Sequence, residues 1–390
     1  MNICFLTTEY PNQNSGGVEH VTYDLANGFI ENGHQVHIIS IFPLKNQTEQ
    51  SKLFLGIIIG NDLNKLTDTI AYIKQNNINV IIDQSHLSIT QHYLGEIKKQ
   101  TYAKLIKVLH TDPAAAEKGT IDNYPILSNN ILNIGKAKIL NTIRKAKRHQ
   151  YLEKEYKRWY SLYDKIVLLS NKFIPVFTSY INTDPQNKIT SIPNPLIIHG
   201  AAEKYNKEDI VLYVGRLCKQ AKRPDRLIRI WEKVYRNNPT WKLIVIGDGE
   251  LKQQLIDYCD KKNIQNIEFT GQTDPNPFYK KASILCLTST YEGFGLVLTE
   301  ALSNQIIPIA FNSYEAITDL ISNGNNGYLI KPFDLKAYAD CLTKLMQSEA
   351  LQNQMRNSIA KTFDNKKYNI YTIANQWNVL FNDIIRDSNI

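Results

Sequence analysis

The sequence predicts an α/β fold built from two halves, each with its own parallel sheet. Short apolar runs rich in β-branched residues recur along the 390-residue chain, and longer polar or amphipathic segments separate them. This alternation is typical of parallel strands that are connected by crossover helices. The pattern starts at the N-terminus and starts again near residue 210, so we expect two α/β domains.

The first half is predicted to begin with a strand, a loop and a helix. Residues 3–8 (ICFLTT) form a short apolar run, and the turn-rich segment EYPNQNSGG follows it. Residues 18–32 then carry apolar side chains at helical spacing, which indicates an amphipathic helix. Further strands of this half are expected at QVHIIS (35–40), VIID (80–83), LIKVLH (105–110) and KIVLLS (165–170).

The second half repeats the pattern after a break at residues 192–209, which are rich in proline, small and charged residues. Residues 210–215 (IVLYVG) are its first expected strand. Residues 223–238 are the next helix, because Pro224 near the start suits a first helical turn. Further strands are expected within WKLIVIGDG (241–249), IEFTG (267–271), SILCLTS (283–289) and IIPIAFN (306–312).

Composition narrows the class of protein. A hydrophobic content of 43% and a charged content of 21% fit a folded chain rather than a disordered one. The five cysteines form no CxxC pair and no cluster with metal spacing, so we expect a reduced, cytoplasmic protein. The first ten residues lack the features of a signal peptide, and no apolar run reaches the roughly 18 residues of a membrane span. The net charge of +8 indicates an anionic partner without naming it.

Residues that follow the expected strands point to an anion site, because ligands of parallel sheets bind beyond the carboxyl ends of the strands. Gly16 and Gly17 precede the first helix, whose N-terminus would offer bare backbone N–H groups. Arg216 and Lys222 follow the first strand of the second half and can grip phosphate oxygens. Each pair alone has a plainer interpretation, as loop glycines or as a solvated basic turn. Together they suggest a diphosphate bound in one cleft between the domains.

The sequence lacks two motifs, one that binds metal ions and one that binds phosphate. It contains neither a D-x-D motif nor a GxxxxGK[ST] phosphate loop. The charge of a bound diphosphate would then be met by basic side chains and helix ends. We therefore expect no metal and no cofactor.

Residues 291–300 (YEGFGLVLTE) place two carboxylates eight residues apart around two glycines. Neither a helix nor a strand favours Gly293 and Gly295, so we expect a loop whose backbone approaches a ligand closely, with a helix directly after it. Glu292 can accept hydrogen bonds from sugar hydroxyls, and Glu300 from a ribose. The plainer alternative is one helix-capping acid and one solvated acid.

In this combination the sequence resembles the retaining glycosyltransferases of family GT4, which have the GT-B fold. The resemblance implies two Rossmann-like domains facing a central cleft, with an acceptor-binding domain at residues 1–200 and a nucleotide-sugar-binding domain at 201–370. A C-terminal helix at about 371–390 would cross back onto the first domain. The segments that carry the resemblance are GGVEHVTYDLANGFIENGHQVHIIS, VLHTDP, IPNPL, VGRLCKQAKRPDRLIRIW, WKLIVIGDGEL and ASILCLTSTYEGFGLVLTEAL.

The resemblance assigns catalytic roles to four matching positions. Arg216 and Lys222 match the pair that grips the diphosphate, although the spacing between the two varies in the family. Glu292 matches the glutamate beside the donor sugar. His110 matches a histidine near the reacting sugar.

The resemblance also assigns residues to donor binding. Gly16 and Gly17 match the glycine loop that faces the donor phosphates. The backbone of Phe294 and Gly295 would touch the sugar, and Glu300 matches the glutamate on the nucleotide ribose.

The implied activity is metal-independent transfer of a hexose with retention of configuration. The diphosphate would leave the anomeric carbon, and an acceptor hydroxyl would enter on the same face. We expect a UDP-sugar as donor, with a GDP-sugar as the second choice. The acceptor would be a glycan or a lipid-linked sugar, in the synthesis of capsule, lipopolysaccharide, teichoic acid or glycolipid.

Three other functions fit parts of the pattern. An NAD-dependent dehydrogenase would need a GxGxxG after the first strand and an acidic residue after the second, and both are missing. A sugar-nucleotide epimerase with the GT-B fold remains an alternative. A non-catalytic partner subunit is another, although the intact Arg216, Lys222, Glu292 and Glu300 argue against it.

Residues 136–160 form a basic segment in the half that should bind the acceptor. They contain nine Lys and Arg against two Glu, with apolar and aromatic residues between them. A basic amphipathic helix can lie on an anionic membrane surface, so we hypothesise peripheral attachment to the inner membrane face. The alternatives are a helix packed on its own domain and a surface that binds an anionic protein or polysaccharide. We expect no nucleic acid partner, because no recognised motif accompanies the charge.

Overall fold

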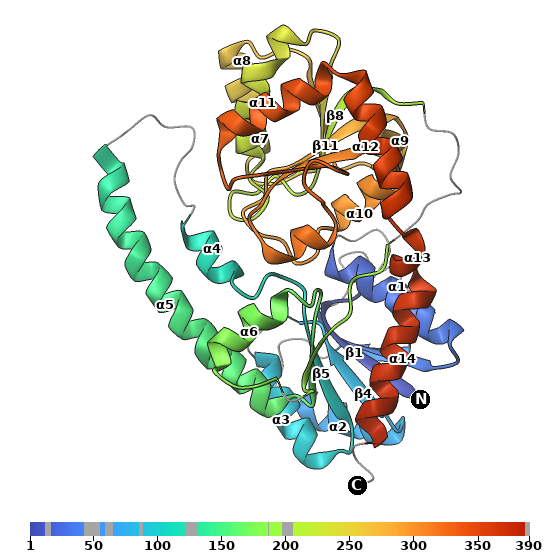
Figure 1. Cartoon of the computed structure of the whole chain (residues 1–390). Helices are drawn as coiled ribbons and strands as arrows, with labels where there is room; N and C mark the ends of the chain where they lie inside the picture. Colours follow the sequence, from blue (N-terminus) through green and yellow to red (C-terminus); the bar gives the residue numbers. More distant parts are fainter. Residues whose placement is uncertain are drawn as a thin grey trace. The chain divides into compact units, whose positions relative to one another are not determined.

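The computed structural model describes two compact units, each built from separate stretches of the chain (Figure 1). Unit 1 comprises Met1–His110, Leu152–Pro195 and Lys366–Ile390, and unit 2 comprises Thr111–Tyr151 and Leu196–Asn365. Within these stretches, the structure describes residues 1–11, 17–42, 55–58, 65–85, 89–121, 132–185, 187–196 and 206–386.

Unit 1 contains a seven-stranded parallel sheet with the strand order β3-β2-β1-β4-β5-β6-β7. The order reverses direction between β1 and β4, which makes this the topological switch point where ligands of such sheets bind. The strands are β1 (Asn2–Glu9), β2 (Gln35–Phe42), β3 (Leu55–Ile58), β4 (Val80–Asp83), β5 (Lys104–Leu109), β6 (Lys165–Leu168) and β7 (Ile189–Ser191).

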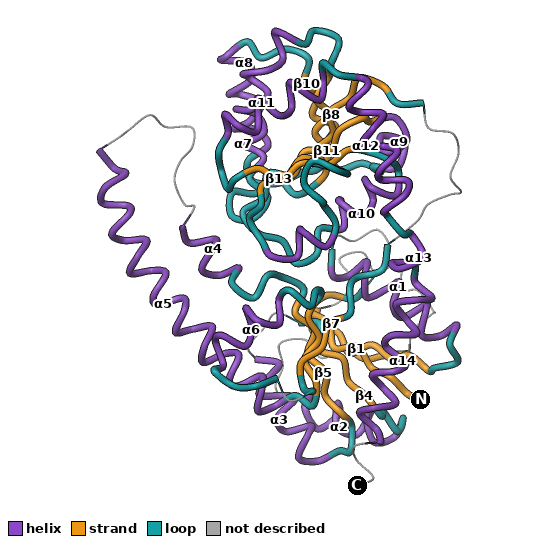
Figure 2. The backbone as a smooth tube through the Cα atoms, in the orientation of Figure 1, coloured by secondary structure: helices purple, strands orange, loops and turns teal. Residues whose placement is uncertain are grey.

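Helices lie on both sides of the sheet of unit 1 (Figure 2). Because both faces are covered, the strands are near-continuous apolar runs, as in the almost wholly buried β1 and β4. The helices of unit 1 that follow or join these strands are α1 (Val18–Glu31), α2 (Leu66–Gln75), α3 (Ile89–Gln100), α6 (Phe173–Ile181) and, from Leu152 on, α5 (Leu132–Leu162). The helix α4 (Ala115–Ile121) and the first part of α5 belong to unit 2.

Unit 2 contains a six-stranded parallel sheet with the order β10-β9-β8-β11-β12-β13. Its switch point lies between β8 and β11. The strands are β8 (Glu208–Val214), β9 (Lys242–Ile246), β10 (Ile267–Gly271), β11 (Ala282–Leu287), β12 (Ile307–Phe311) and β13 (Tyr328–Ile330). The helices are α7 (Pro224–Val234), α8 (Lys252–Lys262), α9 (Asn276–Lys281), α10 (Leu296–Ser303), α11 (Leu335–Met346) and α12 (Glu349–Thr362). The short helix α13 (Asn365–Tyr368) begins at the last residue of unit 2 and otherwise belongs to unit 1.

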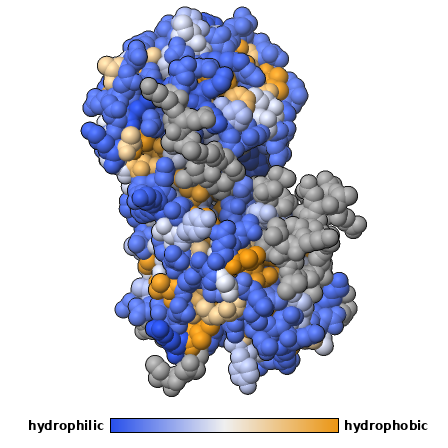
Figure 3. All heavy atoms as spheres, turned by 90° about the vertical axis from the view of Figure 1, so that its right-hand side faces the viewer, coloured by the Kyte–Doolittle hydropathy of each residue, from blue (hydrophilic) through white to orange (hydrophobic). Residues whose placement is uncertain are grey.

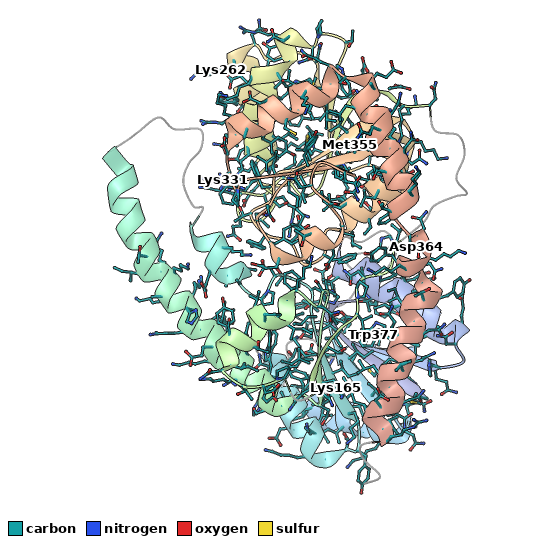
Figure 4. The ribbon with its side chains drawn as sticks, viewed as in Figure 1. Lys165, Lys262, Lys331, Met355, Asp364 and Trp377 are labelled. Atoms are coloured by element: carbon teal, nitrogen blue, oxygen red, sulfur yellow. The ribbon has the colours of Figure 1, made fainter. Side chains whose placement is uncertain are left out.

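The last helix, α14 (Ile370–Arg386), packs against α1 of unit 1. The ring of Trp377, labelled in Figure 4, lies 6.0 Å from the ring of Phe29, measured between centroids. Phe381 lies 5.3 Å from the same ring of Phe29. All three side chains are buried, so the C-terminal helix shares an aromatic core with the first helix of the chain.

The predicted α/β class with two parallel sheets is confirmed. Each run expected to form a strand does so, from β1 at the N-terminus to β12. The sequence analysis did not predict β3, β7 or β13. The predicted boundary near residue 200 stays a prediction, because residues 197–205 lie outside the described residues.

The surface is mainly hydrophilic, with small apolar patches on the face that Figure 3 presents. Among the residues that the structure describes, no helix combines the length and the apolar character needed to cross a lipid bilayer.

Candidate functional site

The loop after β11 forms one side of the switch point in unit 2. Glu292 lies in this loop and is 9% exposed, and α10 begins after Gly295. Gly295 has φ +83°, a conformation that residues with a side chain rarely adopt. A Cβ atom at this position would also lie 2.8 Å from the hydroxyl oxygen of Tyr314. The position therefore requires glycine for two reasons: the left-handed backbone conformation and the lack of room for a Cβ beside the Tyr314 hydroxyl.

An ion pair connects this loop to the loop after β8. The Lys222 Nζ atom lies 2.7 Å from Oε1 of Glu292, and the Ser289 hydroxyl donates to the same oxygen at 2.6 Å. The backbone N–H of Thr290 donates to the carbonyl of Ala221 at 2.7 Å, which ties the two loops together a second time. The pair is only partly exposed, so water screens it less than a surface pair.

Two arginines beside Lys222 serve the framework rather than the site. Arg223 is fully buried and forms a two-point contact with Asp225, at 2.9 and 3.0 Å. Arg226 donates to the carbonyl of Thr288 at 2.9 Å and lies over the ring of Phe333, and burial lowers its pKa to about 9. Arg216, in contrast, has an exposed side chain at the start of the same loop.

Glu300 lies in the second turn of α10, where its carboxylate accepts a hydrogen bond from the hydroxyl of Tyr279. Tyr279 comes from α9 and is 1% exposed. Burial, together with the charge of Glu300, raises the pKa of Tyr279 well above its usual value, so this hydroxyl stays a donor. The contact fixes the orientation of Glu300.

The segment from Thr111 to Ile121 belongs to unit 2 and docks on the same loop. The backbone N–H of Asp112 donates to the carbonyl of Glu292 at 3.1 Å. The Asp112 carboxylate accepts from Lys118 at 2.6 Å, and Lys118 also pairs with Glu315 at 3.0 Å. Asp112 is fully buried, and this burial raises its pKa to about 6 although Lys118 opposes the shift.

His110 and Gly17 lie in unit 1. The imidazole Nε2 of His110, at the end of β5, is hydrogen-bonded to the side-chain oxygen of Gln84, which follows β4. Gln84 is 2% exposed, and its preceding residue Asp83 is held by Lys107 at 2.9 Å and by the hydroxyl of Tyr163. This buried network fixes the turn that carries Gln84.

The glycine loop of unit 1 is described only in part. Gly17 is the N-cap of α1, with φ +60°, and no described side chain caps the helix there. The predicted Gly16 lies outside the described residues.

Within unit 2 the structure brings together most residues that the sequence analysis selected. Arg216 and Lys222 follow β8, whereas Glu292, the buried Phe294, Gly295 and Glu300 follow the neighbouring β11. The sequence analysis missed Ser289, Asp112, Tyr279, Tyr314 and Gln84. Asp112 and Ser289 stand within quoted segments, VLHTDP and SILCLTS, but neither carried a signal of its own that marked it as a site residue.

This arrangement suits a ligand with a negative and a polyhydroxyl part. Lys222 and Arg216 can neutralise an anion, and the N-terminus of α10 adds backbone donors. The carboxylates of Glu292 and Glu300 can accept hydrogen bonds from hydroxyl groups.

The sequence matches known proteins in both of its halves. Residues 197–362 match the family model "Glycosyl transferases group 1". The chain is 29% identical over 204 residues to the poly(ribitol-phosphate) alpha-N-acetylglucosaminyltransferase of Staphylococcus aureus, an alignment covering 52% of this chain and 41% of that protein. It is 25% identical over 374 residues to an uncharacterized glycosyltransferase of Haemophilus influenzae, covering 93% and 95%. It is 26% identical to the amylovoran biosynthesis glycosyltransferase AmsD of Erwinia amylovora, covering 57% and 63%.

Solved structures share the fold across nearly the whole chain. The crystal structure of TarM aligns with a TM-score of 0.72 at 15% identity, covering 98% of this chain and 99% of that one. HepE from Anabaena, in complex with UDP, aligns with a TM-score of 0.72 at 15% identity, covering 98% and 100%. These likenesses show the fold alone, and the fold is GT-B, as predicted.

The buried Asp112 gives a pH prediction. Its pKa of about 6 in the folded protein exceeds the roughly 3.9 of an unfolded aspartate. The folded state therefore binds more protons than the unfolded state between these values, and the free energy of unfolding falls as pH rises from about 4 to about 6. We expect Asp112→Asn to flatten this slope, measured by urea unfolding at several pH values.

Asp340 provides the control, because its carboxylate is exposed on α11. Asp340→Asn should leave the slope as in the wild type. Equal slopes for wild type and Asp112→Asn would show that Asp112 ionises normally in the folded protein.

Proposed function

We propose that the chain is a retaining, metal-independent hexosyltransferase. Its residues 197–362 match the group 1 glycosyl transferase model, and it has the GT-B fold. It would move a sugar from a nucleotide sugar to an acceptor hydroxyl during cell-surface glycan synthesis. The observation that carries the proposal is the ion pair of Lys222 with Glu292 at the switch point of unit 2. The pair puts an ammonium group, which could bind phosphate, beside a carboxylate, which could accept hydrogen bonds from sugar hydroxyls.

The donor is proposed to be a UDP-sugar. Arg216 and Lys222 would bind its diphosphate, and Glu300, oriented by Tyr279, would accept hydrogen bonds from the ribose. The structures of TarM and of HepE that contain UDP support this choice of base. A diphosphate that reaches Lys222 competes with Glu292 for the ammonium group, and it thereby releases the carboxylate oxygen for the sugar.

The reaction needs little from the protein except charge stabilisation. The bond between the anomeric carbon and the diphosphate oxygen breaks, and the acceptor oxygen bonds to the same face of that carbon. The acceptor proton passes to the leaving phosphate. Arg216 and Lys222 would stabilise the negative charge that develops on the diphosphate, and the carboxylate of Glu292 would face the positive sugar.

Two residues of unit 1 are proposed to assist. His110, whose Nε2 atom is hydrogen-bonded to Gln84, would contact the reacting sugar. Gly16 and Gly17 would present the N-terminus of α1 to the donor phosphates. The sequence lacks a D-x-D motif, and the proposed cations take the place of a metal.

The donor site yields a kinetic prediction. We expect Arg216→Ala and Glu292→Ala each to lower kcat by at least about a hundredfold, the scale of a lost transition-state contact. The measurement is nucleotide release from UDP-sugars with and without acceptor. Lys336→Ala serves as the control, because its ion pair with Asp340 is exposed on α11.

A folded Glu292→Ala variant with near-normal turnover would remove Glu292 from the assignment. A chelator should leave much of the activity, whereas complete loss that a metal restores would contradict the proposed charge balance. Nucleotide release that does not require an acceptor would favour an epimerase.

The acceptor is proposed to be a glycan or a lipid-linked sugar at an anionic membrane surface. Residues 142–151 of α5 are all exposed, including the basic Lys145, Lys147 and Arg148. The apolar residues further along are not available for a membrane, because Leu152, Tyr156 and Trp159 are buried in unit 1. Among the residues whose side chains the structure describes, the proposed contact narrows to 142–151, where Ile143 and Tyr151 are about half exposed.

We expect the wild-type protein to sediment with anionic liposomes at physiological salt, since each basic residue near such a surface contributes roughly 1 kcal/mol. Changing Lys145, Lys147 and Arg148 to Glu should abolish sedimentation. The matched control changes the exposed Lys261, Lys262 and Lys280 to Glu, which alters the net charge equally. Wild type that stays in the supernatant, or a control that fails equally, contradicts the membrane proposal.

A further inference from the structure

The hydroxyl of Tyr314 is buried without a hydrogen-bond partner among the residues that the structure describes. Tyr314 follows β12 in unit 2, and its side chain is 2% exposed. Buried polar groups in folded proteins are normally hydrogen-bonded, and a bound ligand is one source of such a partner.

Other buried tyrosines of unit 2 all have partners for their hydroxyls. Tyr338 donates to the carbonyl of Ile309 at 2.5 Å, and Tyr235 donates to the carbonyl of Asn263 at 3.1 Å. Tyr279 donates to the carboxylate of Glu300. Tyr314 differs from these three, although a phenylalanine would fill its place in the core equally well.

The position of this hydroxyl places it at the candidate site. It lies 2.8 Å from where a Cβ of residue 295 would be, and Gly295 is the N-cap of α10. No side chain caps α10 at Gly295. The Tyr314 hydroxyl therefore lies close to the backbone of Gly295, directly before the first turn of α10.

The charges around this hydroxyl favour a neutral ligand group over an anion. Burial raises the pKa of Tyr314 well above its usual value, and the negative charges of Glu292, Asp112 and Asp319 add to the shift. The hydroxyl is thus protonated and able to donate. A phosphate would be repelled by the same carboxylates, whereas a sugar hydroxyl would not.

We propose that the Tyr314 hydroxyl forms a hydrogen bond with a hydroxyl group of the transferred sugar and thereby contributes to the choice of sugar. The inference rests on the proposed function, because it takes the group beside Glu292 and Gly295 to be the sugar of the donor. Tyr314 would act as a specificity-determining residue that binds the sugar and not the nucleotide.

Tyr314→Phe tests the inference, because it removes the hydroxyl and keeps the ring. We expect an unchanged or higher melting temperature, since no hydrogen bond of the free protein is lost. The Kd for UDP, from calorimetry, should not change. The kcat/KM should fall about threefold to tenfold for the UDP-sugar that the wild type uses best among UDP-glucose, UDP-galactose and UDP-N-acetylglucosamine, the size of one neutral hydrogen bond.

Tyr338→Phe is the matched control. Its hydroxyl has a partner in the core, so this variant should melt at a lower temperature and keep its kcat/KM. A Tyr314→Phe variant that behaves like this control would overturn the inference and identify a structural hydroxyl. An equal loss of affinity for UDP would also overturn it, since the contact would then be with the nucleotide.

The outcome for the wild type separates the inference from the proposed function. A wild type that turns over a UDP-sugar while Tyr314→Phe matches it contradicts the role of Tyr314 alone. A wild type that neither binds UDP nor releases it from any of the three sugars contradicts the proposed function, and the inference falls with it.

Discussion

The ion pair between Lys222 and Glu292 holds together the two loops on which the candidate site depends. These loops follow β8 and β11, which are neighbours in the sheet although about seventy residues separate them in sequence. While the pair persists, Lys222 spends one of its three N–H donors on Glu292, and the Oε1 atom of Glu292 already accepts from both Lys222 and Ser289. The pair therefore keeps both groups in place, and under the proposed function a ligand with one anionic and one polyhydroxyl part would compete for both.

Much of the framework could be predicted from local patterns. Short apolar runs rich in β-branched residues, set between amphipathic segments, predicted ten of the strands of the two halves. This works because parallel sheets with both faces covered bury most strand residues. β3 and β13 escaped prediction, since their short segments carry little signal of their own and are defined by pairing with β2 and β12. The role of the last helix required the resemblance to a family, because a hydrophobic stripe around Trp377 does not say which partner it covers.

The candidate site divides in the same way. Residues directly after strands, such as Arg216 and Glu292, could be selected because ligands gather at the carboxyl ends of parallel strands. Ser289, Tyr279 and Tyr314 could not, because each acts through a contact with a residue distant in sequence or across a turn. Asp112 is a further example, since its influence on the loop of Glu292 is a backbone hydrogen bond that no side-chain pattern records.

The most direct test of the central claim is calorimetric binding of UDP to Lys222→Met and Glu292→Gln. If the diphosphate takes Lys222 from Glu292, Lys222→Met should weaken UDP binding by about tenfold or more, the scale of a charge-assisted hydrogen bond. Glu292→Gln should bind UDP at least as tightly as the wild type, because it removes the competitor for the ammonium group. Equal weakening in the two variants would contradict the account, since the pair would then act on the nucleotide as one structural unit.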